Sequence, residues 1–257
     1  MQILKRLLDF YIQSSIHVGL AVLCLVHITV FSNDLVKHSF YPSCVFFGTI
    51  AGYNFLKYFQ VFTKNNFYSK KFSGILGISL VAVVGFFYFL FLLNTKVQIH
   101  ILISGLFVLL YPFLRKFGWL KLFLVSFVVT YITVFIPFQT DKYSISELYL
   151  NVLQRFLIII SLLIPFEIMD SKTDDKSLDT LPQKFGIDST KLFGTLLVIP
   201  FIILQFLKLQ PSYIVLPIGI ITVLLINFTT LERSKYYTSF WVESVPIFWL
   251  ILLILFQ

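Results

Sequence analysis

Apolar runs recur along the whole chain, separated by short polar breaks. About 20 helical residues cross the roughly 30 Å hydrocarbon core of a bilayer, and most of these runs are close to that length. Because backbone groups cannot stay unbonded in lipid, each run is predicted to be a transmembrane helix. The pattern therefore predicts an all-α, polytopic membrane bundle of about nine helices, at residues 14–31, 40–62, 74–93, 97–113, 118–138, 148–168, 190–208, 212–231 and 240–256.

The composition agrees with this class, since 58% of the 257 residues are hydrophobic, more than in an ordinary soluble domain. The runs leave no room for a separate soluble domain, so residues 1–257 are expected to form one integral membrane domain. Residues 1–13 mix basic and apolar side chains without a cleavage site, and they are expected to form an amphipathic interfacial segment. Cys24 and Cys44 both lie in apolar runs and predict neither a disulfide framework nor a zinc site.

Basic residues are divided unequally between the two sides of the predicted bundle. If the N-terminus is cytoplasmic, fourteen lysines and arginines lie on the cytoplasmic side and only Lys37, Lys96, Lys142 and Lys208 lie on the other. The positive-inside rule then predicts a multi-pass protein of the cell inner membrane, with the N-terminus and a loop at 169–189 in the cytoplasm. This topology explains the net charge of +8, so no nucleic-acid partner is expected.

Negative charge gathers in the stretch FEIMDSKTDDKSLDTLP, which holds five of the twelve acidic residues. On a helix, Glu167, Asp170 and Asp174 fall on one face, while Lys172 and Lys176 point away and do not neutralise them. Close carboxylates repel one another unless a cation lies between them, and Mg²⁺ takes oxygen ligands of this kind. The stretch therefore predicts either a magnesium site that holds a phosphate or a solvated loop whose charges only keep it in water.

The run EIMDSKTD at 167–174, followed by TLP at 180–182, resembles a known motif. It is similar to the second aspartate-rich motif of the UbiA superfamily of intramembrane prenyltransferases, D-I-x-D-x-x-x-D followed by T-L-P. Glu167 replaces the leading aspartate, and Phe166 replaces the arginine usual before it. The stretch YPFLRK at 111–116 resembles the family's Y-P-x-x-K-R segment.

This resemblance implies a UbiA-prenyltransferase-like bundle with a polar pocket at its cytoplasmic face. It implies transfer of an isoprenoid chain from a polyprenyl diphosphate to a lipophilic or aromatic acceptor in the membrane lipid, assisted by Mg²⁺. Metal ligands would be Glu167, Asp170 and Asp174. Catalytic residues would be Asp170, Asp174 and Lys57, and substrate-binding residues would be Asn54, Lys57, Tyr111, Arg115 and Lys116.

The family's first motif, N-D-x-x-D-x-x-x-D, is expected at the inner end of the second helix. Only Asn54 is kept there, and the three aspartate positions hold Phe55, Tyr58 and Phe62. One metal site is therefore predicted to have lost its ligands. Lys57 either presents its charge to the pocket in place of a lost ion or snorkels to the interface in a protein that no longer does chemistry.

These departures leave a second function open. The chain is either a working prenyltransferase or a catalytically lapsed relative that binds a prenyl lipid or scaffolds a membrane partner. A transporter fits less well, because no repeated pair of broken helices is evident. Arg155 also lies inside a predicted span, near its outer end, and its guanidinium group is expected to snorkel to the interface.

Overall fold

The structure is a computed structural model that describes residues 2–35, 40–63, 70–114, 118–139, 144–174 and 178–256, without the side chains of 2, 59–63 and 70–72. All regular structure in these ranges is helical, which confirms the predicted all-α class. The elements are α1 (Gln2–Gln13), α2 (Ile16–Ser32), α3 (Tyr41–Thr63), α4 (Lys70–Phe91), α5 (Thr95–Leu114), α6 (Leu120–Thr130), the π-helix η2 (Tyr131–Phe135), α7 (Ile136–Phe138), α8 (Ile145–Asp170), α9 (Leu181–Phe185), α10 (Ile187–Gln205), α11 (Val215–Asn227), the π-helix η4 (Tyr237–Val242) and α12 (Val245–Phe256).

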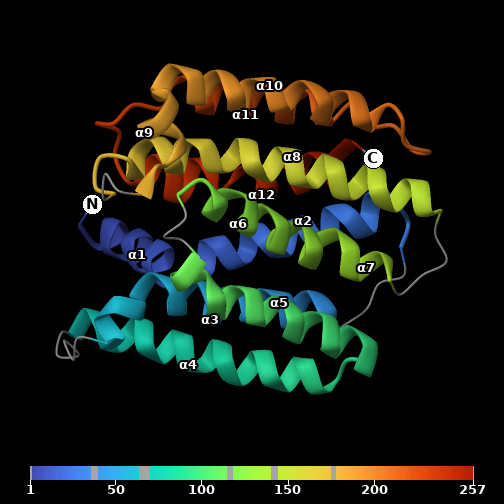
Figure 1. Ribbon diagram of the computed structural model, residues 1–257. Helices are drawn as coiled ribbons and strands as arrows, with labels where there is room; N and C mark the ends of the chain where they lie inside the picture. The colour runs from blue at the N-terminus through green and yellow to red at the C-terminus, as the bar shows by residue number, and fades with distance from the viewer. Residues whose placement is uncertain are drawn as a thin grey trace.

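The helices pack as a ring of neighbours (Figure 1). Contacts run from α2 to α3, from α3 to α5, then through α6, α8, α10, α11 and α12 back to α2. Helix α4 packs on α3, and α8 also contacts α11. Large apolar side chains such as Leu80, Val81 and Phe91 are exposed on α4, as expected for a surface that faces lipid.

Membrane spans are fewer by length and composition than the sequence predicted. In the described part of the chain, six helices are long and apolar enough to cross a membrane, or seven if the pair α1 and α2, bent by 58°, counts as one span. Helix α11 is apolar but shorter than these helices. An integral, multi-pass protein is confirmed, whereas the count of nine spans is not.

One glycine fixes how the start of α6 meets the segment after α8. Gly118 has φ +48°, and a Cβ there would lie 1.9 Å from the carbonyl oxygen of Leu178, so only glycine fits. The next segment starts helix α9, where the Thr180 N–H donates to Oε1 of Gln183 at 3.0 Å in a capping box. These contacts bring the start of α6 against the acidic stretch, at the same end of the bundle as α1 (Figure 1).

Candidate functional site

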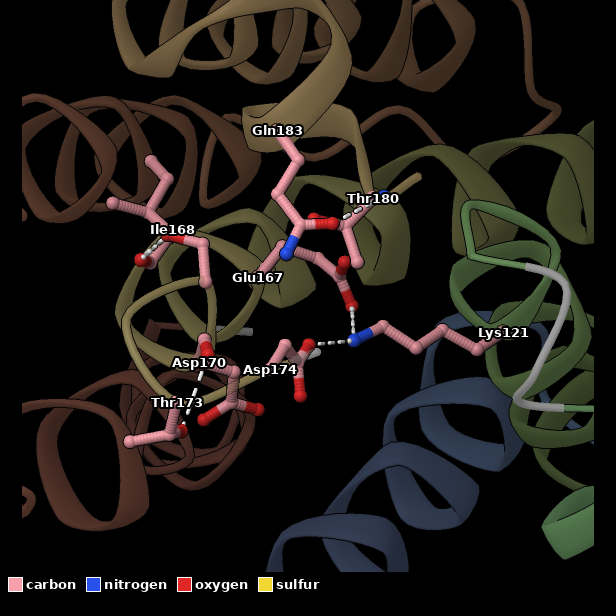
Figure 2. Close-up of polar contacts among 9 residues, drawn as sticks. Lys121, Glu167, Ile168, Asp170, Thr173, Asp174, Thr180 and Gln183 are labelled. Carbon is pink, nitrogen blue, oxygen red and sulfur yellow. Dashed lines mark hydrogen bonds and ion pairs between the residues drawn. The ribbon is translucent and has the colours of Figure 1, made fainter. Parts of the chain in front are cut away.

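Lys121, the second residue of α6, reaches between two acidic side chains of the stretch that ends α8. Its Nζ lies 3.2 Å from Oε1 of Glu167 and 2.9 Å from Oδ2 of Asp174 (Figure 2). The side chains of Lys121, Glu167 and Asp174 are only 9%, 8% and 11% exposed. A buried charge is costly unless it is paired, so these three groups, here called the lysine–carboxylate cluster, stabilise one another.

The prediction for this stretch considered only its own lysines, Lys172 and Lys176, and did not include Lys121. The cation that pairs with Glu167 and Asp174 comes from another helix, α6. A signal for Lys121 was present in the sequence, because an ionisable residue inside a membrane span usually faces the bundle interior and finds a partner there. Lys121 is one of the fourteen basic residues that the positive-inside rule places on the cytoplasmic side.

Asp170 differs from its two acidic neighbours. It is the last residue of α8, its side chain is exposed, and its carboxylate points away from the Lys121 ammonium group in Figure 2. Its carbonyl oxygen accepts the N–H groups of Thr173 at 2.9 Å and Asp174 at 2.8 Å. These bonds continue the helix end and fold the stretch back toward Lys121.

A magnesium ion does not fit the lysine–carboxylate cluster as it stands. Within the described residues, no group of three or more His, Cys, Asp or Glu side chains is arranged to hold a metal ion. The Lys121 ammonium group takes the place between Glu167 and Asp174 where a divalent ion would need to sit. Magnesium ligation by Glu167, Asp170 and Asp174 together stays a prediction.

Asn54, predicted to bind substrate, holds the bend between α1 and α2. Its Oδ1 accepts the Ser15 hydroxyl at 2.6 Å, and its Nδ2 donates to the Ser14 carbonyl at 3.0 Å and the Ser79 hydroxyl at 2.9 Å. Ser15 has φ +61°, a left-handed conformation that favours glycine. The buried amide of Asn54 thus stabilises a strained turn.

Lys57 reaches the same bend. Its Nζ donates to the carbonyl oxygens of Ile12 and Gln13, both at 3.4 Å, and the Tyr58 hydroxyl donates to Gln13 at 2.8 Å. The last carbonyls of a helix carry partial negative charge, so Lys57 binds the C-terminal end of α1. The structure therefore gives Lys57 a role that neither interpretation of the sequence included.

Of the remaining predicted substrate-binding residues, the structure describes Tyr111. Tyr111 is in the last turn of α5 and is half-buried. Arg115 and Lys116 lie outside the described residues, so their contact with a phosphate group stays a prediction.

A second buried charged group lies in the first half of α8, where Arg155 is only 5% exposed. Its Nη2 donates to the Thr29 hydroxyl at 3.0 Å, and its guanidinium carbon lies 5.2 Å from the centre of the Trp249 ring. Its Nη1 is buried without a hydrogen-bond partner in the described part of the chain. The expectation that Arg155 snorkels to the interface was wrong, because α2 and α12 enclose the side chain.

Lys208, just after α10, joins this region. Its Nζ donates to Oδ1 of Asn151 at 2.7 Å and to Oε1 of Gln154. Burial, together with a smaller effect of the positive charge of Arg155, lowers the pKa of Lys208 to about 7, although the negative charge of Glu147 acts in the opposite direction. Arg155 and Lys208, with the neutral groups that they contact, are here called the cationic cluster.

Comparison with solved structures identifies the fold of this chain. No family model and no curated protein matches the chain. Among solved structures, an apo UbiA homologue from Aeropyrum pernix K1 superposes with a TM-score of 0.67 at 14% sequence identity, covering 93% of this chain and 97% of that one. The chain has the UbiA-type fold. A digeranylgeranylglyceryl phosphate synthase in membranes is also similar, with a TM-score of 0.57, 18% identity, and coverage of 99% and 97%.

The UbiA-type fold confirms the architecture that the two short motifs implied. At these identities the similarity describes the path of the backbone, so the site must be argued from this chain's own side chains. The acidic stretch and Lys121 meet at one end of the bundle, and the cationic cluster lies in the other half of α8. Of the predicted site residues, Glu167 and Asp174 meet at the acidic end through Lys121.

Proposed function

We propose that this chain is an intramembrane prenyltransferase of the UbiA type. It would move an isoprenoid chain from a polyprenyl diphosphate to a lipophilic or aromatic acceptor. The observation that carries the proposal is the UbiA-type fold over nearly the whole chain, with the acidic motif of Glu167, Asp170 and Asp174 at the end of one long helix. The structural similarity, at 14% and 18% identity, supports this kind of reaction, and the choice of substrates is part of the proposal.

The proposed reaction breaks the bond between the allylic carbon and the diphosphate oxygen. Pyrophosphate leaves with the bonding electrons, the acceptor attacks the allylic cation, and the acceptor loses a proton. Cationic side chains favour this step because negative charge builds up on the leaving group. Arginine and lysine are the side chains that bind phosphate oxygens with charge-assisted hydrogen bonds.

Two of the proposed substrate-binding residues have other partners in the structure. Asn54 and Lys57 are engaged at the bend between α1 and α2, so their binding to substrate would require the bend to open. Tyr111, Arg115 and Lys116 then carry the proposed diphosphate contacts. Asp170 and Asp174 stay the proposed catalytic carboxylates, with Asp170 the more accessible of the two.

Calorimetric titration of the purified chain with a short prenyl diphosphate tests the proposal. Binding is expected in detergent or nanodiscs, and replacing Arg115 and Lys116 together by Gln should weaken it at least tenfold. Lys172→Gln serves as the matched control, because it removes an exposed lysine of the acidic stretch and should leave binding unchanged. Absence of binding at millimolar ligand, with and without Mg²⁺, would contradict a prenyltransferase.

A second function, that of a lapsed relative which binds a prenyl lipid, is favoured by one observation. Asn54, the one residue kept from the first motif, and Lys57, one helical turn further on, both hold the α1–α2 bend and so have a structural role. Titration with a neutral polyprenol separates the two functions. Equal affinity for polyprenol and prenyl diphosphate would favour the lapsed relative, whereas a strong preference for the diphosphate would favour the enzyme.

A further inference from the structure

We infer that Lys121 is the resident cation of the acidic site, so that its ammonium group replaces a divalent ion between Glu167 and Asp174. The site would then keep its shape without magnesium. An anionic ligand would meet an ammonium group there and not a metal ion. The part of this inference that concerns a diphosphate ligand rests on the proposed function, whereas the part that concerns Mg²⁺ and stability does not.

The Lys121 ammonium group makes two buried, charge-assisted contacts, one with each carboxylate. Both carboxylates lie within 3.2 Å of Nζ, and none of the three side chains is more than 11% exposed. An ammonium group has three N–H donors, and these two bonds use two of them. Since Glu167 and Asp174 are its ion-pair partners among the described residues, the third donor is left for an oxygen of a ligand such as a phosphate group.

The backbone around Lys121 holds the ammonium group in place. Gly118 packs against the carbonyl of Leu178 so closely that no Cβ fits, and the Lys121 N–H donates to the Gly118 carbonyl at 3.3 Å. Leu122, the next residue, is 1% exposed and belongs to a core cluster with Ile164 and Ile168 of α8. Lys121 therefore cannot leave its carboxylates by a rigid movement of α6 without breaking this packing.

The charges at the site also favour the single ammonium group over a divalent ion. The three acidic positions of the first motif hold Phe55, Tyr58 and Phe62, so fewer carboxylates need a counter-ion in this chain. A divalent ion between Glu167 and Asp174 would repel the Lys121 ammonium group or would have to displace it. Binding of Mg²⁺ to the wild-type site should accordingly be weak.

Thermal unfolding of the full chain in detergent, measured against MgCl₂ concentration and against EDTA, tests the inference. The wild-type Tm should be the same in EDTA and at millimolar Mg²⁺. Lys121→Gln leaves two carboxylates without their cation, so its Tm should be lower in EDTA and should rise by about 3 °C with Mg²⁺. Lys172→Gln, the exposed control in the same stretch, should behave as wild type.

The wild-type protein alone can overturn the inference, which matters if Lys121→Gln fails to fold. A clear rise of the wild-type Tm with millimolar Mg²⁺ that disappears in Asp174→Asn would show that a metal ion binds there and displaces the lysine. Calcium serves as a second divalent probe. If neither Mg²⁺ nor Ca²⁺ changes the Tm of the wild type or of Asp174→Asn, the result supports Lys121 as the resident cation.

Titration with a short prenyl diphosphate separates this inference from the proposed function. Equal binding in EDTA and in Mg²⁺ supports the lysine as the cation of the site. Binding that requires Mg²⁺ overturns the inference and leaves the prenyltransferase proposal standing. No binding under either condition removes the prenyltransferase proposal, and the unfolding measurements then decide about Lys121 by themselves.

Discussion

Two buried charged clusters lie along helix α8, and they differ in what surrounds their charged groups. Near its end, Glu167 and Asp174 share the ammonium group of Lys121. In its first half, Arg155 and Lys208 contact a hydroxyl, two side-chain amides and an aromatic ring, with no carboxylate within salt-bridge distance in the described part of the chain. The first cluster pairs one ammonium group with two carboxylates, whereas the second surrounds its cations with neutral dipoles and a π face.

This difference predicts how each cluster responds to change. Removing the shared cation of a buried ion-paired set leaves both carboxylates as uncompensated charges, which is strongly destabilising. Removing one of two neighbouring buried cations relieves the repulsion between them. The loss in the free energy of unfolding should therefore be small, or stability should increase. The lysine–carboxylate cluster is therefore expected to be intolerant of substitution, and the cationic cluster is expected to be sensitive to pH.

The largest expected contrast is in which side of the membrane each cluster faces. Cysteines at Ser171 and Ser144, which flank the two ends of α8, should be labelled from the cytoplasm and from the outside respectively, by the positive-inside rule. The background should lack Cys24 and Cys44, which are buried. Labelling of intact and permeabilised cells with a membrane-impermeant maleimide measures this, and the reverse pattern would place the acidic site outside and contradict its access to a cytoplasmic diphosphate.

Loss of Lys121 should give the largest change in stability. Lys121→Met leaves Glu167 and Asp174 buried without a cation, which is expected to cost about 3 kcal/mol of the free energy of unfolding. Denaturant or thermal unfolding in detergent measures the change. Adding Glu167→Leu to Lys121→Met removes one of the stranded carboxylates and should recover part of the loss. Wild-type stability in Lys121→Met would mean that the cluster contributes nothing.

Lys208 should make stability depend on pH. Its pKa in the folded chain is about 7 because of burial, whereas lysine in an unfolded chain titrates near 10.4. Between these values the unfolded state binds more protons, so stability should rise with pH, by about 2 kcal/mol from pH 7 to pH 9. Unfolding at several pH values measures this rise, and Lys208→Met should abolish it.

The exposed Lys96 provides the matched control for Lys208, because it lies on the same predicted side of the membrane. Lys96→Met should keep the full pH dependence of the wild type. A rise of equal size in Lys208→Met would assign the titration to some other group.

The smallest effect is expected at Arg155. Arg155→Met removes a guanidinium group whose Nη1 has no partner in the described residues, so the stability should change by about 1 kcal/mol or less, since a lost cation–π contact with Trp249 offsets the relief of desolvation. Unfolding measured beside Lys121→Met makes the comparison direct. A loss as large as that of Lys121→Met would show that the cationic cluster has an anionic partner of its own.

The sequence by itself determined that the chain is a helical membrane protein, where most helices begin and end, and that acidic residues gather at the end of one of them. Each of these follows from local patterns: an apolar run, a polar break, or a motif such as TLP. The short motifs also led to the UbiA-type fold, which the backbone comparison then confirmed.

Only the tertiary structure decided which side chains meet. Lys121 was found beside Glu167, Arg155 was found facing inward, and Asn54 was found holding a bend. The physical reason is that membrane helices such as α8 are apolar on nearly all sides, so the hydrophobic pattern does not fix their rotation about their own axes. That rotation is set by contacts such as Gly118 with Leu178, between residues far apart in the chain, and it decides whether a charged side chain faces lipid, water or a partner.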